Sequence, residues 1–145
     1  MPLAARGLHP IVRAMIDSFA STSGITLRED GAFDARFDSS WYQGRGAFGG
    51  LVAALFTRAF AAKAGDDGRP LRTLTCHFCA PALAGPARIE VEIPRASSAV
   101  SHLTARMIQE DGVVAIATAT RDPTSSPTAM PSRATRSGRD QALWW

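Results

Sequence analysis

The sequence predicts an α+β fold in which an antiparallel β-sheet wraps around one long helix. Residues 49–64 are apolar around almost the whole circumference of a helix, and such a helix must be buried by its neighbours. Most of the chain from residue 71 to residue 121 has the composition or the alternation of β-strands. These strands follow one another instead of alternating with helices, which favours α+β over α/β. A length of 145 residues fits a single domain.

The first part of the chain predicts a helix and a hairpin. Residues 9–21 have apolar side chains at helical spacing, and their proline is tolerated in a first turn. Two short segments, 25–29 and 32–37, flank the turn dipeptide Asp30-Gly31 and are expected to pair. Segment 38–50 is expected to be a glycine-rich loop.

The long helix is expected to begin at the glycine pair of residues 49 and 50. At about 1.5 Å per residue it would be roughly 24 Å long, the width of a small sheet. Its markedly polar residues are Thr57, Arg58 and Lys63, which fall near one another late in the segment. The rest of the helix is therefore expected to lie in the core.

Four further segments predict the strands of the sheet. The third and fourth flank a Glu-Asp-Gly turn, which indicates another hairpin. In the second, Ile89, Val91 and Ile93 alternate with charged residues, so these three are expected on one buried face. The segments are 71–81, 87–93, 99–109 and 113–121.

The end of the chain differs in composition. Residues 122–145 are rich in proline, serine and threonine, which predicts a linker or tail. The paired Trp144 and Trp145 at its end would be able to dock on the body or on a partner. We therefore expect one domain over residues 1–121, with an N-terminal helical segment at 1–24.

Composition excludes several classes of function. The net charge is +3, but the 16 basic residues are scattered among 13 acids, which argues against a nucleic-acid-binding protein. The longest apolar run is short and is interrupted by Arg58, which argues against a membrane protein. The opening residues show no secretory signal, so a cytoplasmic location is expected.

The two cysteines form the motif Cys-His-Phe-Cys, residues 76–79. A zinc site needs about four ligands, and no second cysteine or histidine pair supplies them. A redox pair normally opens a helix, whereas this motif belongs to a strand-like segment. Two free thiols are therefore expected, with neither metal nor cofactor.

The order of several motifs resembles a known family. An FGG motif opens an alanine-rich helix, and an HFCAP strand, a GPARIEVEI strand and a QEDG turn follow in that order. Over about residues 31–121 this order resembles the type II acyl-CoA thioesterases and related thioesterase-like proteins, and in particular the first of their two hot-dog repeats. The resemblance implies a hot-dog fold, an acyl-CoA or acyl carrier protein thioester as substrate, and a homodimer or higher homo-oligomer.

Candidate ligand-contacting residues follow from this resemblance. The backbone N–H groups of Gly49 and Gly50 would be able to stabilise the oxyanion of thioester hydrolysis, although close packing explains the same glycines. Trp41 and Phe48 would either line an acyl tunnel or pack in the core or at an interface. A polar group at the turn before the third strand would contact ligand or a second subunit, namely Arg95, Ser97 and Ser98.

The resemblance does not supply a catalytic carboxylate. The acid and glutamine positions of the family's second repeat correspond to Thr73 and Thr120, and the acid of single-repeat thioesterases corresponds to Thr57 or Arg58. A threonine hydroxyl alone cannot take a proton from water near neutral pH.

Other titratable residues do not settle the question. His77 and His102 are expected to be packed strand residues, and nothing in the spacing of Asp34 or Asp38 brings them to the site. Two hypotheses stay open. The chain is a thioester hydrolase completed by a second subunit, or it is a catalytically silent subunit or half that binds acyl thioesters or completes a partner's site.

Overall fold

The computed structural model describes residues 9–110 and 112–123. Within these residues, no helix is long and apolar enough to cross a membrane. The predicted tail, Trp144 and Trp145 included, falls outside the described residues apart from its first two positions.

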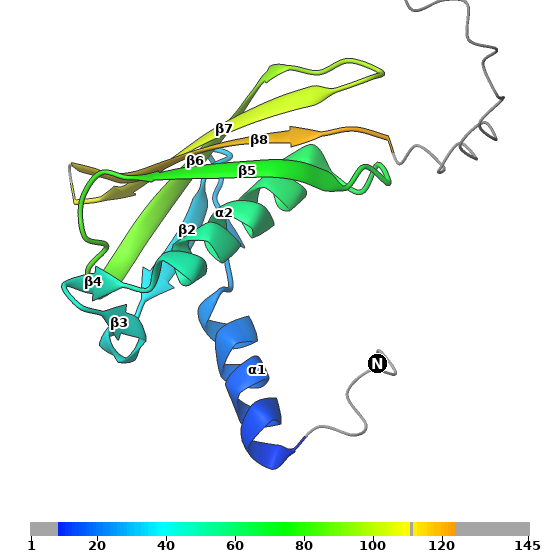
Figure 1. The fold of residues 1–145 in the computed structure, drawn as a ribbon. Helices are drawn as coiled ribbons and strands as arrows, with labels where there is room; N and C mark the ends of the chain where they lie inside the picture. The colour runs from blue at the N-terminus through cyan, green and yellow to red at the C-terminus, as the bar shows by residue number, and fades with distance from the viewer. Residues whose placement is uncertain (1–8, 111, 124–145) are drawn as a thin grey trace, which may run out of the picture.

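One six-stranded antiparallel sheet forms the body of the molecule (Figure 1). The order of its strands is β1-β2-β6-β7-β8-β5, so β1 and β5 are the edges. Strands β7 and β8 form the hairpin that the sequence predicts, and β6 pairs with β7 in the same antiparallel way. The bounds are β1 Thr26–Leu27, β2 Phe33–Phe37, β5 Leu71–Phe78, β6 Gly85–Arg95, β7 Ser101–Gln109 and β8 Gly112–Arg121.

The long helix α2, Gly49–Ala64, lies across the concave face of this sheet (Figure 1). Its bounds match the predicted segment 49–64, and the expected wrapping of an antiparallel sheet around one helix is confirmed. The expectation that the rest of the helix lies in the core was too broad, because Ala61 and Ala62 are exposed. The side chains that the helix buries lie on one face at helical spacing, and the sheet covers this face. They are Leu51, Val52, Leu55, Phe56, Ala59 and Phe60.

Large helix residues meet small sheet residues in the core. The rings of Phe56 and Phe60 stack with centroids 6.3 Å apart, and both side chains are fully buried. The strands opposite contribute four buried alanines to the same cluster. They are Ala105, Ala115, Ala117 and Ala119. The volume that the alanines leave is thus available to the two rings, as the high density of protein interiors requires.

The segment before α2 is more ordered than the expected loop. A 3₁₀ turn, Ser39–Trp41, leads into a small hairpin of β3, Tyr42–Gln43, and β4, Gly46–Ala47. The loop prediction was too coarse because Gly44, with φ at 77°, allows a two-residue turn between very short strands.

Strand β6 also departs from the prediction at one position. Ile89 and Val91 are buried, but Ile93 is 36% exposed. The pairing of β6 with β7 shifts register between Glu92 and Arg95, so the simple alternation of faces ends there.

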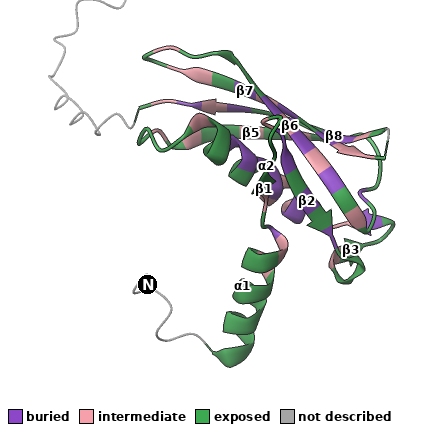
Figure 2. Cartoon of the chain, turned by 180° about the vertical axis from the view of Figure 1, so that it is seen from behind, coloured by how far each residue is buried: buried purple, intermediate pink, exposed green. Residues whose placement is uncertain are grey.

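Helix α1, Pro10–Thr22, confirms the predicted helix at 9–21 and stands away from the sheet (Figure 2). Near its C-terminal end, the ring of Phe19 packs edge-on against Trp41 with centroids 5.6 Å apart. Its other large apolar side chains are exposed. They are Ile11, Val12, Met15 and Ile16.

Candidate functional site

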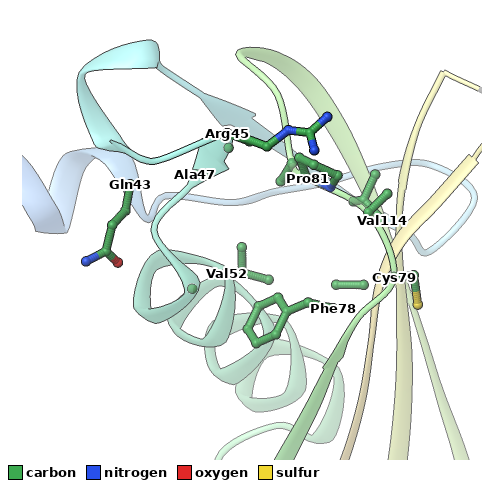
Figure 3. A pocket seen from close by; sticks show the side chains of 13 residues that line it. Gln43, Arg45, Ala47, Val52, Phe78, Cys79, Pro81 and Val114 are labelled. Carbon is green, nitrogen blue, oxygen red and sulfur yellow. The ribbon is translucent and has the colours of Figure 1, made fainter.

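A pocket of about 490 Å³ lies at the N-terminal end of α2 (Figure 3). The β3–β4 hairpin, the first turn of α2, the end of β5 and the start of β8 surround it. Most of the lining is apolar, and this volume lies in the range of small-molecule sites. The lining residues are Gln43, Arg45, Gly46, Ala47, Gly49, Val52, Phe78, Cys79, Ala80, Pro81, Ala82, Val114 and Ala115.

Gly49 brings backbone donors to this pocket. It is the first residue of α2 and lines the pocket directly. The carbonyl of Phe48 accepts from Leu51 N–H at 2.9 Å, while the N–H groups of Gly49 and Gly50 have no protein acceptor among the described residues. Unpaired N–H groups at a helix start carry partial positive charge and favour a negatively charged or polarised oxygen.

Both glycines also lie close to aromatic rings, which would have to shift to admit a side chain. A Cβ on Gly49 would lie 3.1 Å from Cζ of Phe78, and a Cβ on Gly50 would lie 2.4 Å from Cε1 of Phe48. Two exposed aromatic rings thus flank the start of the helix. Packing against the rings and donation from the backbone N–H are separate properties of the same glycines, and neither excludes the other.

Hydrogen bonds fix the loop of residues 79–84, which connects β5 to β6 and forms one wall of the pocket. The side chain of Gln109 accepts from the N–H of Leu83 and donates to its carbonyl, both at 2.7 Å, and also donates to the carbonyl of Pro86 at 3.2 Å. The hydroxyl of Tyr42 accepts from the N–H of Ala84 at 2.6 Å. These contacts tie the wall both to the β7–β8 hairpin and to β3.

Arg45 is the one charged side chain among the lining residues. Figure 3 shows it extending towards Pro81, with Val52 and Phe78 below it in the view. It forms no ion pair within the described residues. The pocket therefore combines an apolar floor with a cation at its rim, and no Asp, Glu or His is among its lining residues.

Of the predicted contact residues near this end, Gly49 alone lines the pocket. Trp41 is partly buried and packs against α1 and the core, which fits the packing interpretation of its sequence position. Phe48 caps the start of α2, is 43% exposed, and covers Gly50.

The predicted pair Thr73 and Thr120 does come together. Their hydroxyl oxygens lie 2.8 Å apart on neighbouring strands. Their strand neighbours Leu74 and Ala119 pack into the core, so the two hydroxyls lie on the opposite, outer face of the sheet. Thr73 is also five residues from Phe78, or about 17 Å along β5. The pair is thus away from the pocket.

The predicted group at the β6–β7 turn also lies away from the pocket. Arg95 pairs with His102 across the two strands. The carbonyl of Ser97 accepts from Arg69 at 2.7 Å, and Ser98 is exposed beside it. This turn is at the other end of β6 from the pocket wall, and a ligand role for it stays a prediction.

Neither acid considered from the sequence lines the pocket. Asp34 accepts from Arg28 at 2.8 Å on the exposed side of β2. Asp38 accepts from the N–H of Ser40 at 2.8 Å, and hydrogen bonds from Ser40 lower the pKa of this carboxyl. Thr57 donates to the carbonyl of Ala53 on the outer side of α2.

The thiols are free, as in the sequence interpretation. Cys76 is half-buried beside the core, and burial raises the pKa of its thiol. Cys79 directly follows β5 and lines the pocket. The described residues contain no group of three His, Cys, Asp or Glu side chains that would hold a metal ion.

Sequence reasoning missed Gln43, Arg45, Phe78 and Pro81 as lining residues. The available signal was the Gln-Gly-Arg-Gly stretch of residues 43–46, where glycines on either side of Arg45 allow a tight turn close to another segment. Such a stretch does not show which segment it approaches.

Comparison with protein families agrees with this architecture. Residues 37–121 match the family described as the acyl-CoA thioesterase N-terminal domain. The chain belongs to this family. No curated protein sequence matches the chain.

Solved hot-dog structures have the same fold. A hot-dog protein of unknown function from Alicyclobacillus acidocaldarius is 26% identical, with a TM-score of 0.68 over 86% of this chain and 46% of that one. The acyl-CoA thioesterase II TesB2 from Mycobacterium marinum is 16% identical, with a TM-score of 0.61 over 75% and 39%. The BH2602 protein from Bacillus halodurans, solved with CoA, is 14% identical, with a TM-score of 0.61 over 83% and 98%. The family member described here spans less than half the length of the first two.

Proposed function

We propose that this thioesterase-family protein hydrolyses an acyl thioester of CoA or of an acyl carrier protein, acting as a homo-oligomer. One observation carries the proposal. Gly49 starts the buried helix, lines a pocket of about 490 Å³, and has an N–H with no protein acceptor among the described residues.

The chemistry follows from the position of these donors. A thioester carbonyl placed at the helix start would accept from Gly49 N–H, with Gly50 N–H beside it. Negative charge develops on that oxygen when water attacks the carbonyl carbon, and fixed donors stabilise this charge more than that of the ground state. The apolar floor at Val52 and Ala115 would receive the acyl group.

Arg45 suits the other end of such a substrate. Both CoA and an acyl carrier protein present the acyl group on an arm that carries phosphate. An arginine at the rim, without an ion pair among the described residues, would bind that phosphate in the two-pronged manner typical of guanidinium groups.

The base that activates water would come from a second copy of the chain. None of the lining residues is an Asp, Glu or His, and thioester hydrolysis near neutral pH needs a proton acceptor. Strand β5 is a sheet edge, and the backbone groups on its outer side are available for pairing. Pairing of two such edges would bring a second subunit next to Phe78 at the pocket. Sedimentation showing a folded monomer alone would contradict this part of the proposal.

Two substitutions at Gly49 isolate its N–H. Gly49→Ala adds a Cβ near Phe78 but keeps the donor. Gly49→Pro adds similar bulk and removes the donor, and the first position of a helix is where proline fits best. Phe48 has ψ at 127°, which is compatible with a following proline.

Hydrolysis would be followed as free thiol release from a panel of acyl-CoA thioesters. We expect kcat for Gly49→Pro to fall about 100-fold or more below that of Gly49→Ala, the usual cost of losing one oxyanion donor. Equal rates for the two variants, with both folded by circular dichroism, would eliminate the donor role.

The absence of a carboxylate from the lining residues favours one alternative, a silent subunit that binds acyl thioesters or completes a partner's site. Binding of CoA thioethers without turnover of any thioester in the panel would identify this role. Turnover above the buffer rate would exclude it.

A further inference from the structure

The core beneath the pocket restricts what its floor can hold. We propose that Phe56, with Phe60 behind it, closes an alanine-lined track under α2 and limits this site to short acyl groups. The inference rests on the proposed function, because it concerns the acyl group of the same thioester.

The track follows β8. Ala115, Ala117 and Ala119 alternate along this strand on the face that packs into the core, so they are about 7 Å apart in succession. Ala115 is also a lining residue of the pocket. A row of the smallest apolar side chains thus leads from the pocket floor along the strand.

The neighbouring strands also place small side chains beside the track. In the register of the sheet, Ala117 lies between Ala105 on β7 and Cys76 on β5. All three are small residues of the same core region. Space for an alkyl chain in a protein interior needs such small side chains along a continuous path.

Side chains of α2 belong to the same core cluster as these alanines. Val52 lines the pocket, and Phe56 follows it one turn later on the same face of α2. The rings of Phe56 and Phe60 stack at 6.3 Å, and both side chains have 0% exposure. An alkyl chain that passed Val52 would therefore have to displace a fully buried ring. We therefore expect the alkyl chain of a bound acyl group to end at Phe56.

Calorimetry with S-alkyl-CoA thioethers tests this limit without requiring catalysis. The probes are CoA and its S-ethyl, S-butyl, S-octyl and S-dodecyl derivatives, titrated into the full chain. Each methylene that becomes buried raises affinity about fourfold. We expect affinity to rise up to the butyl compound and to stay within about twofold of it for the octyl and dodecyl compounds. A continued rise of about fourfold per methylene through dodecyl would overturn the inference.

Matched variants locate the limit. Phe56→Leu shortens the side chain nearest the pocket, and Phe60→Leu makes the same change one turn further along the helix. We expect Phe56→Leu to bind the octyl compound at least tenfold more tightly than the wild type does, with affinity for the ethyl compound unchanged. Phe60→Leu should keep the wild-type profile. Equal effects of the two substitutions would overturn the assignment to Phe56.

The outcomes separate the two proposals. If CoA and all thioethers fail to bind, the proposed function and this inference fall together. If they bind and affinity keeps rising with chain length, only the length limit is wrong. Should Phe56→Leu not fold, as judged by its melting curve, the wild-type series alone still decides the limit.

Discussion

The two ends of α2 differ in how the molecule treats the polar groups of the helix backbone. At the C-terminal end, Arg121 donates to the carbonyl of Gly65 at 3.3 Å, to that of Arg69 at 2.8 Å, and to Asp67 at 2.8 Å. At the N-terminal end, Gly49 and Gly50 have N–H groups without a protein acceptor among the described residues, and a pocket lies beside them.

This difference separates stability from function within one helix. Every helix leaves unpaired carbonyls at its end and unpaired N–H groups at its start. A buried cation at the end, here 7% exposed, donates to the C-cap carbonyl of Gly65 and to the carbonyl of Arg69 in the loop that follows, and it complements the helix dipole. Donors left free at the start are available to a ligand. We therefore expect substitutions at the C-terminal end to reduce stability and those at the N-terminal end to alter the pocket.

The largest effect is expected for Arg121→Met. The substitution keeps apolar bulk but removes the side-chain donor to the carbonyls of Gly65 and Arg69 and one of the donors to Asp67, for an expected loss of about 3 kcal/mol in the free energy of unfolding. Urea unfolding measures it. The matched control is Arg72→Met, which breaks an exposed ion pair with Asp122 and should cost less than about 1 kcal/mol. Equal losses in the two variants would contradict the special role of Arg121 at the C-terminal end of α2.

Gly46→Ala should have the next largest effect, at the pocket end. Its new Cβ would lie 2.9 Å from Cβ of Pro81 and 3.0 Å from the carbonyl oxygen of Ala82. The hairpin and the pocket wall must then separate, at a cost of about 2 kcal/mol. Gly112→Ala is the control, because its Cβ would meet its nearest neighbour at an ordinary 3.8 Å. Thermal melting of both variants decides, and a fully stable Gly46→Ala would show that the wall is not rigid.

Gln109→Leu should produce a smaller loss. It removes three hydrogen bonds that hold the wall at Leu83 and Pro86, with an expected cost of about 1 kcal/mol because this region is close to solvent. Hydrogen exchange should show faster exchange at the Leu83 amide. Gln43→Leu serves as the control, since Gln43 lines the pocket without a hydrogen bond to the wall among the described residues. Unchanged exchange at Leu83 would contradict the bracing role.

The smallest effect is expected for the pH dependence of stability at Asp38. Hydrogen bonds from Ser40 lower the pKa of Asp38 from its ordinary value of 3.8. A carboxyl with a lowered folded-state pKa stabilises the fold above its unfolded pKa, and this contribution disappears as pH falls through the folded value. Asp38→Asn keeps a capping acceptor without the charge. We expect the wild type to melt slightly above this variant at pH 7 and level with it near pH 2. A constant difference would contradict the linkage.

Local patterns in the sequence were sufficient for most elements of the fold. The bounds of α2, the hairpin at Asp30-Gly31 and the strands that flank the Glu-Asp-Gly turn follow from periodicity and turn residues that are close together in the chain. The motif order also identified the family before the family match showed it. The exposed Ile93 and the short β3–β4 hairpin were missed, because a register shift and a two-residue turn depend on neighbouring segments.

The candidate site was predicted only at Gly49. The helix start is marked in the sequence by its glycines, and its free N–H groups follow from helix geometry wherever the helix lies. Thr73 and Thr120 were matched by position, and the structure pairs them on the outer face of the sheet instead of at the pocket. Sequence position does not specify which face a strand residue presents when the register is unknown.

The sequence by itself determined that one apolar helix needs a sheet around it, since that requirement depends only on which residues lie on the helix surface. The tertiary structure decided where the pocket lies and what lines it. Arg45, Phe78 and Val114 come from three segments far apart in the chain, and only the packing of the hairpin, the edge strand and the helix start against one another brings them together. Contacts of this kind depend on how separate elements pack, which no local pattern encodes.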